Sequence, residues 1–200
     1  TLRRLNRYEE ALEIYHQALE AYRQVEGTTR AQADCLGGIG RALRGLGRYE
    51  ESHKAFRQAL EAYRTVPGTA RPQAVCLLDI GNALGDVGRY EEALEAYRQA
   101  LEAYRQVEGT ERRQALVLFN IGDCLEDLRH YQEAVTAHEQ SLDLYQQIGG
   151  TERQQAICRE NMANCLRRAG RPEEALTAYH QALEAYRQVE GSERSQAVCI

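Results

Sequence analysis

Apolar residues return along the chain with the spacing of one buried face of an α-helix. In the stretch that Gly68 opens, Leu77, Ile80, Leu84 and Val87 follow one another at intervals of three or four residues. This spacing predicts a first amphipathic helix, here called helix A, that runs to about Val87.

A second helix, here called helix B, is predicted directly after Gly88. Its buried stripe consists of Tyr90, Ala93, Leu94, Tyr97, Ala100, Leu101, Tyr104 and Val107. Its opposite face carries Glu91, Glu92, Glu95, Arg98, Glu102 and Arg105. One apolar and one charged face per helix indicate a pair of packed helices, each about 18 residues long. The paired glutamates lie on the solvated face, so we do not interpret them as catalytic carboxylates.

The same helix pair recurs at a fixed interval. Arg-Tyr-Glu-Glu begins at Arg7, Arg48 and Arg89, and related tetrapeptides begin at His130 and Arg171. Successive starts lie 41 residues apart, as 48−7 and 89−48 show. Such a period marks stacked repeats, each packed only on its neighbours. We therefore expect an all-α chain that forms a single solenoid over residues 1–200. Its expected parts are a helix B over 7–26, units over 27–67, 68–108, 109–149 and 150–190, and the start of another helix A over 191–200.

Glycine and threonine mark the predicted turns. Gly-Thr or Gly-Ser pairs begin at Gly27, Gly68, Gly109, Gly150 and Gly191. Glycine suits the left-handed position after a helix, and threonine is expected to cap the helix that follows. Thr151 and Gln154 have the spacing of a capping box. At the other turn, Arg129 replaces a glycine, which would cost about 1 kcal/mol in a left-handed conformation unless the turn is rebuilt.

Composition narrows the possible partners. Hydrophobic residues make up 43% of the chain, charged residues 28%, and the net charge is −5, which suits a folded chain without the basic stripe that nucleic acid requires. No apolar run approaches the ~20 residues of a membrane span, and the chain begins without a signal peptide. We expect a cytoplasmic protein that does not bind membranes, and the start at Thr1 suggests part of a longer polypeptide.

Cysteines and histidines give no sign of a metal site or of catalysis. Cys35, Cys76, Cys158 and Cys199 share one repeat position, and Cys124 and Cys165 share another. Their separation along the chain differs from the short spacings of zinc ligands, so buried, reduced core residues are expected. The five histidines are scattered, and no Ser-His-Asp or Cys-His arrangement falls on one face. We therefore expect no enzyme activity, no metal and no cofactor.

This pattern resembles the tetratricopeptide repeat. In that family the helix pair has a large residue, a Leu-Gly pair, a Tyr-like position, a turn glycine, a tyrosine, an alanine, an aromatic residue and a second alanine. The matching residues here are Leu77, Ile80-Gly81, Leu84, Gly88, Tyr90, Ala93, Tyr97 and Ala100. The common unit has about 34 residues, and the unit here is longer because ALEAYRQ occurs twice, at 93–99 and 100–106. Units of this longer type look like those of kinesin light chains and of bacterial signalling arrays.

The resemblance implies a right-handed superhelix whose A helices line a concave groove that binds a protein or peptide. The groove positions implied are Arg41, Arg44, Leu78, Asp79, Asn82, Asp86, Phe119, Asn120, Asp123, Glu126, Asp127, Asn161, Asn164, Arg167 and Arg168. Basic ends and an acidic middle would suit a peptide with basic residues at its centre, and the asparagines would hold its backbone amides. Leu78 and Phe119 would either offer apolar contacts to this peptide or be buried by neighbouring units. Drift of solvated positions is the alternative explanation for the differences between units.

Other functions remain open at this stage. The carboxylate clamp of the family's cochaperones is absent, because Gly37, Leu78, Phe119 and Glu160 stand at its lysine position. A sensor array within a larger signalling ATPase, transcriptional regulator or protease would use the same groove. A structural solenoid that self-associates through uncapped ends is the third hypothesis.

Overall fold

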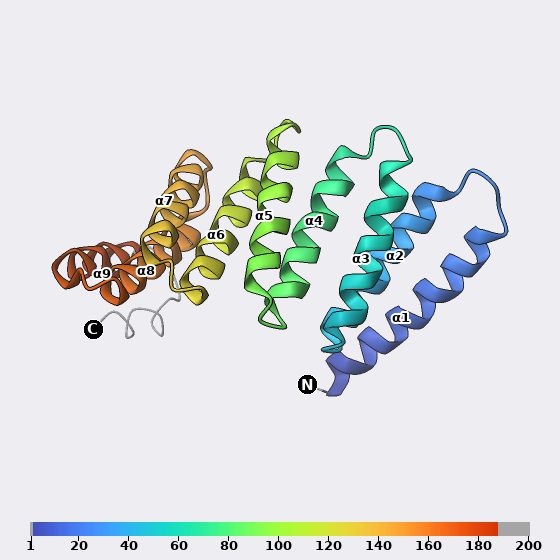
Figure 1. The fold of residues 1–200 in the computed structure, drawn as a ribbon, viewed down its shortest axis with the longest axis horizontal. Coiled ribbons are helices and arrows are strands. Elements are labelled where there is room, and N and C mark those ends of the chain that lie inside the picture. Colours follow the sequence, from blue (N-terminus) through green and yellow to red (C-terminus); the bar gives the residue numbers. More distant parts are fainter. Residues whose placement is uncertain (1, 188–200) are drawn as a thin grey trace. The chain divides into compact units, whose positions relative to one another are not determined.

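The computed structural model describes the backbone of residues 2–187 and the side chains of residues 7–187. Within this part, every secondary-structure element is an α-helix, which confirms the all-α fold class (Figure 1). The chain divides into two compact units, Thr1–Val107 and Glu108–Ile200. The expected helix over 191–200 and the end of the unit over 150–190 lie outside the described residues.

Helices of type B and type A alternate along the chain. The first unit contains α1 (Leu2–Arg23), α2 (Thr29–Gly45), α3 (Tyr49–Arg64), α4 (Ala70–Gly85) and α5 (Tyr90–Arg105). The second contains α6 (Glu111–Asp127), α7 (Tyr131–Gln147), α8 (Glu152–Arg168) and α9 (Pro172–Arg187). Helix α1 thus begins at Leu2 rather than at the expected Arg7 and ends at Arg23. The A helices are α2, α4, α6 and α8.

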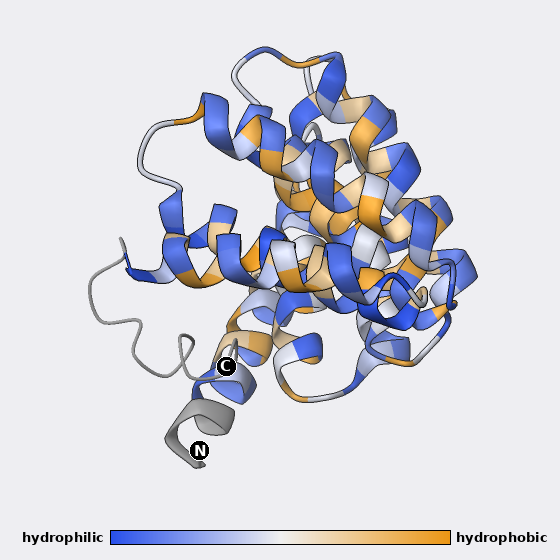
Figure 2. Ribbon diagram, turned by 90° about the vertical axis from the view of Figure 1, so that its left-hand side faces the viewer, coloured by the Kyte–Doolittle hydropathy of each residue, from blue (hydrophilic) through white to orange (hydrophobic). Residues whose placement is uncertain are grey.

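Each unit is a row of helices in which every helix packs on its neighbours in the chain. In the first unit α1 contacts α2, α2 contacts α3, α3 contacts α4 and α4 contacts α5, while the A helices α2 and α4 also touch. The second unit repeats this scheme, with α6, α7, α8 and α9 in sequence and a contact between α6 and α8. Figure 2 shows apolar and polar residues alternating along the same helices, as amphipathic packing requires. None of the described helices is long and apolar enough to cross a membrane.

Most predicted stripe positions are buried. Leu77, Ile80 and Leu84 are at most 8% exposed, as expected for the inner face of helix A. Val87 is an exception, with 38% of its surface exposed. The prediction was wrong here because α4 ends at Gly85, so Val87 belongs to the turn rather than to the helical face.

Small residues on the A helices admit aromatic rings from the B helices. A Cβ atom added to Gly81 would lie 2.5 Å from the ring of Tyr97, and one added to Gly40 would lie 2.6 Å from the ring of Phe56. These rings therefore rest directly on the helix backbone. The repeat fixes this close approach, because Gly122 stands in the same relation to His138.

The turn after each A helix has a Schellman geometry, in which two amides bond back to the last helical carbonyls. After α2, Arg48 N donates to Leu43 O over 2.9 Å and Gly47 N donates to Arg44 O over 3.0 Å. Gly47 has a φ of 76°, in the left-handed region. Arg129 takes the same place after α6, with a φ of 62° and its amide 2.9 Å from Glu126 O. The turn is therefore kept, and the arginine adopts the left-handed conformation.

We expect Arg129→Gly to raise the free energy of unfolding by about 0.5–1 kcal/mol. Glycine removes the strain of a left-handed side chain, about 1–2 kcal/mol, but loses part of this gain to its greater freedom in the unfolded chain. Chemical denaturation followed by circular dichroism measures the change. The reverse substitution at the matching turn, Gly88→Arg, should destabilise by a similar amount, and a stabilising effect there would contradict this account.

The expected threonine caps are wrong. The hydroxyl of Thr69 donates backward to Tyr63 O and Val66 O, at 2.6 and 2.7 Å, and makes no capping bond with α4. Thr151 behaves likewise toward Tyr145 O and Ile148 O, and its partner is Gln155 rather than the capping-box Gln154. The backbone angles of these threonines explain the difference, since they lack the extended conformation of an N-cap. Each hydroxyl closes the helix before it instead of the helix after it.

Candidate functional site

The polar side chains predicted to line the groove are joined in pairs between neighbouring A helices. In the first unit, Arg44 of α2 places Nε 2.5 Å from Asp86 Oδ2 and Nη2 3.4 Å from Oδ1. This two-point contact, together with the nearby acidic groups, raises the pKa of the Arg44 guanidinium. Arg41 lies 3.6 Å from Asp79 of α4. Charge on this face is thus balanced within the unit.

The second unit repeats this arrangement with the acidic residues on its first A helix. Asn161 of α8 donates a 2.9 Å hydrogen bond to Asp123 of α6, and Arg168 Nε lies 3.3 Å from Glu126 Oε1. The separations along the chain match those of the first unit. Asp123 and Asn161 are 38 residues apart, as are Arg41 and Asp79 (79−41). Arg44 and Asp86 are 42 apart, as are Glu126 and Arg168 (168−126).

Two of the four asparagines expected to hold a ligand's backbone bind tyrosines of the B helices. Tyr97 Oη donates to Asn82 Oδ1 over 2.9 Å, and Tyr179 Oη donates to Asn164 Oδ1 over 2.6 Å. These bonds hold the side chains of both asparagines against the B helices.

A second set of tyrosines reaches acidic residues nearer the start of the A helices. Tyr186 Oη donates to Glu160 Oε2 over 2.5 Å, and Tyr63 Oη donates to Asp34 Oδ1. Burial and the bond to Asp34 raise the pKa of Tyr63. These contacts tie the B helices to the first half of α2 and to the middle of α8.

The remaining predicted groove residues differ in exposure. Leu78 is only 3% exposed, so of the two possibilities its burial favours packing over contact with a ligand. Phe119 and Asn120 are half-buried, and the Phe119 ring meets His138 edge-on with centroids 5.3 Å apart. Asp127 and Arg167 are exposed to solvent.

The repeat that contains His138 departs from the tyrosine pattern. His138 stands where Tyr97 and Tyr179 stand in other repeats, is fully buried, and has no hydrogen-bond partner at either ring nitrogen. Its Nε2 lies 3.7 Å from Asp123 Oδ1, beyond hydrogen-bond length. Burial lowers the pKa of His138 to about 4 and raises the pKa of Asp123 to about 7, with Glu126 and Asp127 adding to the latter shift. The imidazole is therefore neutral at pH 7.

Sequence reasoning missed two features of this region. One is the pairing between A helices, which the recurring separations of 38 and 42 residues could have indicated. The other is the proximity of His138 to Glu126 and Cys165, which together form the only group among the described side chains with three possible metal ligands. The described cysteines are buried and form no disulfide, as expected, whereas Cys199 lies outside the described residues.

Comparisons with known proteins agree on the fold. Among solved structures, BtubC (BKLC) from P. vanneervenii aligns with a TM-score of 0.75 and 16% identity, over 92% of this chain and 76% of that one. A putative kinesin light chain of Podospora anserina, with nearly identical TPR-like repeats, aligns at 0.77 and 15% identity, over 93% and 90%. A Rap protein complexed with competence and sporulation factor aligns at 0.70 and 23% identity, over 90% of this chain and 49% of that one.

Sequence comparison identifies the family more directly. No curated protein matches this sequence significantly. The tetratricopeptide repeat model matches residues 1–65, 73–147 and 115–188, which together cover most of the chain. With the repeated helix pairs, the ring-on-glycine contacts and the Schellman turns described above, this match shows that the chain belongs to the tetratricopeptide repeat family.

Proposed function

We propose that the chain is a protein-interaction module that binds a segment of another protein along its A helices. The observation that carries this proposal is the set of half-exposed polar side chains held in place between neighbouring A helices. Arg44 with Asp86 and Asn161 with Asp123 are examples from the two units. Side chains already fixed in one rotamer lose little entropy when a ligand binds. The A helices therefore offer ordered donors and acceptors to an extended backbone.

The ion pairs between A helices change the charge that we expect the bound segment to carry. Since Arg41, Arg44 and Arg168 each lie beside a carboxylate, the face attracts a charged segment less strongly than its residue types suggest. Asp127 is an exposed carboxylate of the acidic middle. We infer that a bound segment carries a basic residue opposite Asp127 and is otherwise held through backbone hydrogen bonds. Charge at this point would act on specificity and association rate.

The relatives are consistent with this role. A Rap protein was solved with competence and sporulation factor bound, so a fold of this kind accommodates a partner. A sensor array in a larger signalling protein would use the same face, and the test below applies equally to it. We propose no catalytic role for this face.

Selection from a random-peptide display library tests the proposal. We expect selected peptides to be enriched in Lys or Arg at a central position and to bind the charge-exchanged variant Asp127→Lys/Arg167→Glu at least about tenfold more weakly, because like charges then face each other. The matched control, Glu184→Lys/Arg187→Glu, makes the same charge exchange on an exposed pair of α9.

Three outcomes would count against this proposal. They are a library that yields no binder, equal binding by the parent and the A-helix variant, and loss of binding in the α9 control alone. The last would assign recognition to the B helices. Sizing at several concentrations belongs to the experiment, because α1 exposes Ile14 and Tyr22 and the turn after it exposes Val25. Self-association through these side chains would compete with peptide binding.

A further inference from the structure

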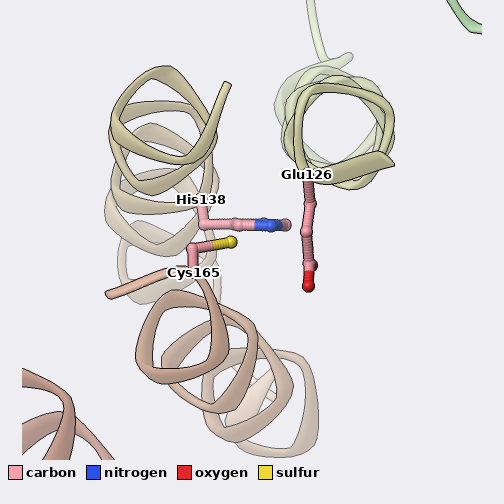
Figure 3. A group of neighbouring side chains, drawn as sticks. All are labelled: Glu126, His138 and Cys165. Atoms are coloured by element: carbon pink, nitrogen blue, oxygen red, sulfur yellow. The ribbon is translucent and has the colours of Figure 1, made fainter. Parts of the chain in front are cut away.

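Three side chains with metal-binding atoms converge in the second unit. They are Glu126 of α6, His138 of α7 and Cys165 of α8, and their ligand atoms all lie within 4.8 Å of one another. Figure 3 shows the imidazole and the thiol projecting from neighbouring helices toward the side chain of Glu126. Each helix supplies one ligand, so the geometry depends on the packing of all three.

His138 is the residue that most needs an explanation. Its ring is fully buried, and neither nitrogen has a hydrogen-bond partner. Buried polar groups are rarely left unpaired, because each costs about 1–3 kcal/mol in lost hydration. Gly122 makes room for the ring, since a Cβ atom there would lie 2.5 Å from it. The fold therefore accommodates an imidazole in a place where a metal ion would supply the missing partner.

The other two ligands are chemically suited to the same ion. Cys165 is fully buried, and its sulfur lies within 4.8 Å of a Glu126 carboxylate oxygen and of the imidazole. Thiolate, imidazole and carboxylate are the three ligand types that zinc combines in proteins, at about 2.0–2.3 Å from the ion. Tetrahedral ligands at these lengths are about 3.3–3.8 Å apart, so the atoms here would have to approach one another by at most about 1.5 Å.

Asp123 and Arg168 complete the surroundings of the cluster. The Asp123 carboxylate lies 3.7 Å from His138 Nε2 and accepts a bond from Asn161, so it borders the cluster beside the imidazole. Arg168 opposes a cation, since it pairs with Glu126 at 3.3 Å. Its side chain is 49% exposed and can turn into solvent when the carboxylate binds a metal.

The same three positions in the preceding repeat hold Gly85, Tyr97 and Cys124. Of these residue types, only cysteine is a common zinc ligand. In the fold of this chain, therefore, the cluster is a departure from the repeat rather than a consequence of it. We propose that Glu126, His138 and Cys165 bind a divalent transition-metal ion of the zinc class. The site shares Glu126 with the A-helix face, but metal binding there does not require that a peptide be bound.

Titration of the full chain with Co²⁺ tests the site, because cobalt bound to a thiolate gives a charge-transfer band in the near ultraviolet. We expect one Co²⁺ per chain and displacement of the band by Zn²⁺. Since loss of an outer-shell partner already weakens metal sites about 10–100-fold, Cys165→Ala and His138→Tyr should weaken binding by at least about 100-fold.

Each variant introduces a residue that stands at the same position in another repeat, so we expect the variants to fold. Alanine stands at the Cys165 position in other repeats, as Ala42 and Ala83, and tyrosine stands at the His138 position, as Tyr97 and Tyr179. Cys124→Ala is the matched control, because Cys124 has the same repeat position as Cys165 but lies outside the cluster. It should keep the band and the affinity.

A second readout separates binding from absorbance. Zn²⁺ should raise the melting temperature of the parent and of Cys124→Ala, and a chelator should reverse the shift, while His138→Tyr should not respond. Absence of the cobalt band, equal affinity in Cys165→Ala and the parent, or loss of the band in Cys124→Ala would each overturn the assignment.

Discussion

Replacing Phe56 by alanine is expected to lower the free energy of unfolding by about 3–5 kcal/mol. The Phe56 side chain is completely buried, and its ring rests on α2 where Gly40 has no side chain. Alanine would leave a cavity that glycine cannot fill. Because each repeat contacts only its neighbours, the loss should also weaken the coupling between the helices on both sides of α3.

Chemical denaturation followed by circular dichroism measures this loss. The matched control in the same unit is Ile14→Ala, which removes an aliphatic side chain that is 64% exposed. Surface changes of this kind usually stay within about 0.5 kcal/mol. If Phe56→Ala lowered the free energy of unfolding by less than about 1.5 kcal/mol, α2 and α3 would have to close the cavity by moving together. That result would contradict the view that the Phe56 ring supports the contact between these helices.

Replacing His138 by tyrosine is expected to raise the free energy of unfolding of the metal-free chain by about 1–3 kcal/mol, the cost of the unpaired buried groups that it removes. In the neighbouring repeats, tyrosines at this position donate hydrogen bonds of 2.9 and 2.6 Å to Asn82 and Asn164. Asp123 occupies the asparagine position beside His138 and can accept the same bond. Gly122 leaves the backbone open to the ring, as Gly81 does under Tyr97.

The comparison is made with a chelator present, so that bound metal does not stabilise the parent. His180→Tyr is the control, since His180 is exposed on α9 and the same substitution there should change stability by less than about 0.5 kcal/mol. If His138→Tyr instead destabilised the chain, the buried imidazole would have to make a favourable interaction that its geometry does not show.

The repeat, the helices and the turn glycines could be predicted from the sequence because they depend on local spacing. Leu77, Ile80 and Leu84 mark a buried face whatever lies opposite, and Gly47 and Gly88 indicate a left-handed turn by residue type alone. The same reasoning placed Thr69 correctly at a turn but assigned its hydroxyl to the wrong helix. Both helix ends offer unpaired groups there, and the backbone angles of the threonine decide between them.

The polar contacts between helices were harder to predict. Arg44 and Asp86 pair because of the way in which neighbouring A helices are shifted along each other. The hydrophobic pattern of one helix contains no information about this shift. His138 was treated only as one of five scattered histidines, since its proximity to Cys165 follows from the packing of α7 against α8. Residue type identified the A helices as the place where the repeats differ. Which of these differing side chains pair with one another could be seen only in the structure.

The separations of 38 and 42 residues have a consequence for how such an array can change in length. Suppose that the 41-residue repeat beginning with α6 were duplicated in tandem. The residue 42 positions after the first Glu126 would then be a copy of Asp127 instead of Arg168, since 168−41 is 127. Duplication of the repeat beginning with α2 would likewise place a copy of Gly45 opposite Arg44 in place of Asp86. The B helices are nearly interchangeable, yet the A helices are matched to specific successors. Duplication of one repeat within this array would therefore place side chains that do not pair next to each other at the new junction.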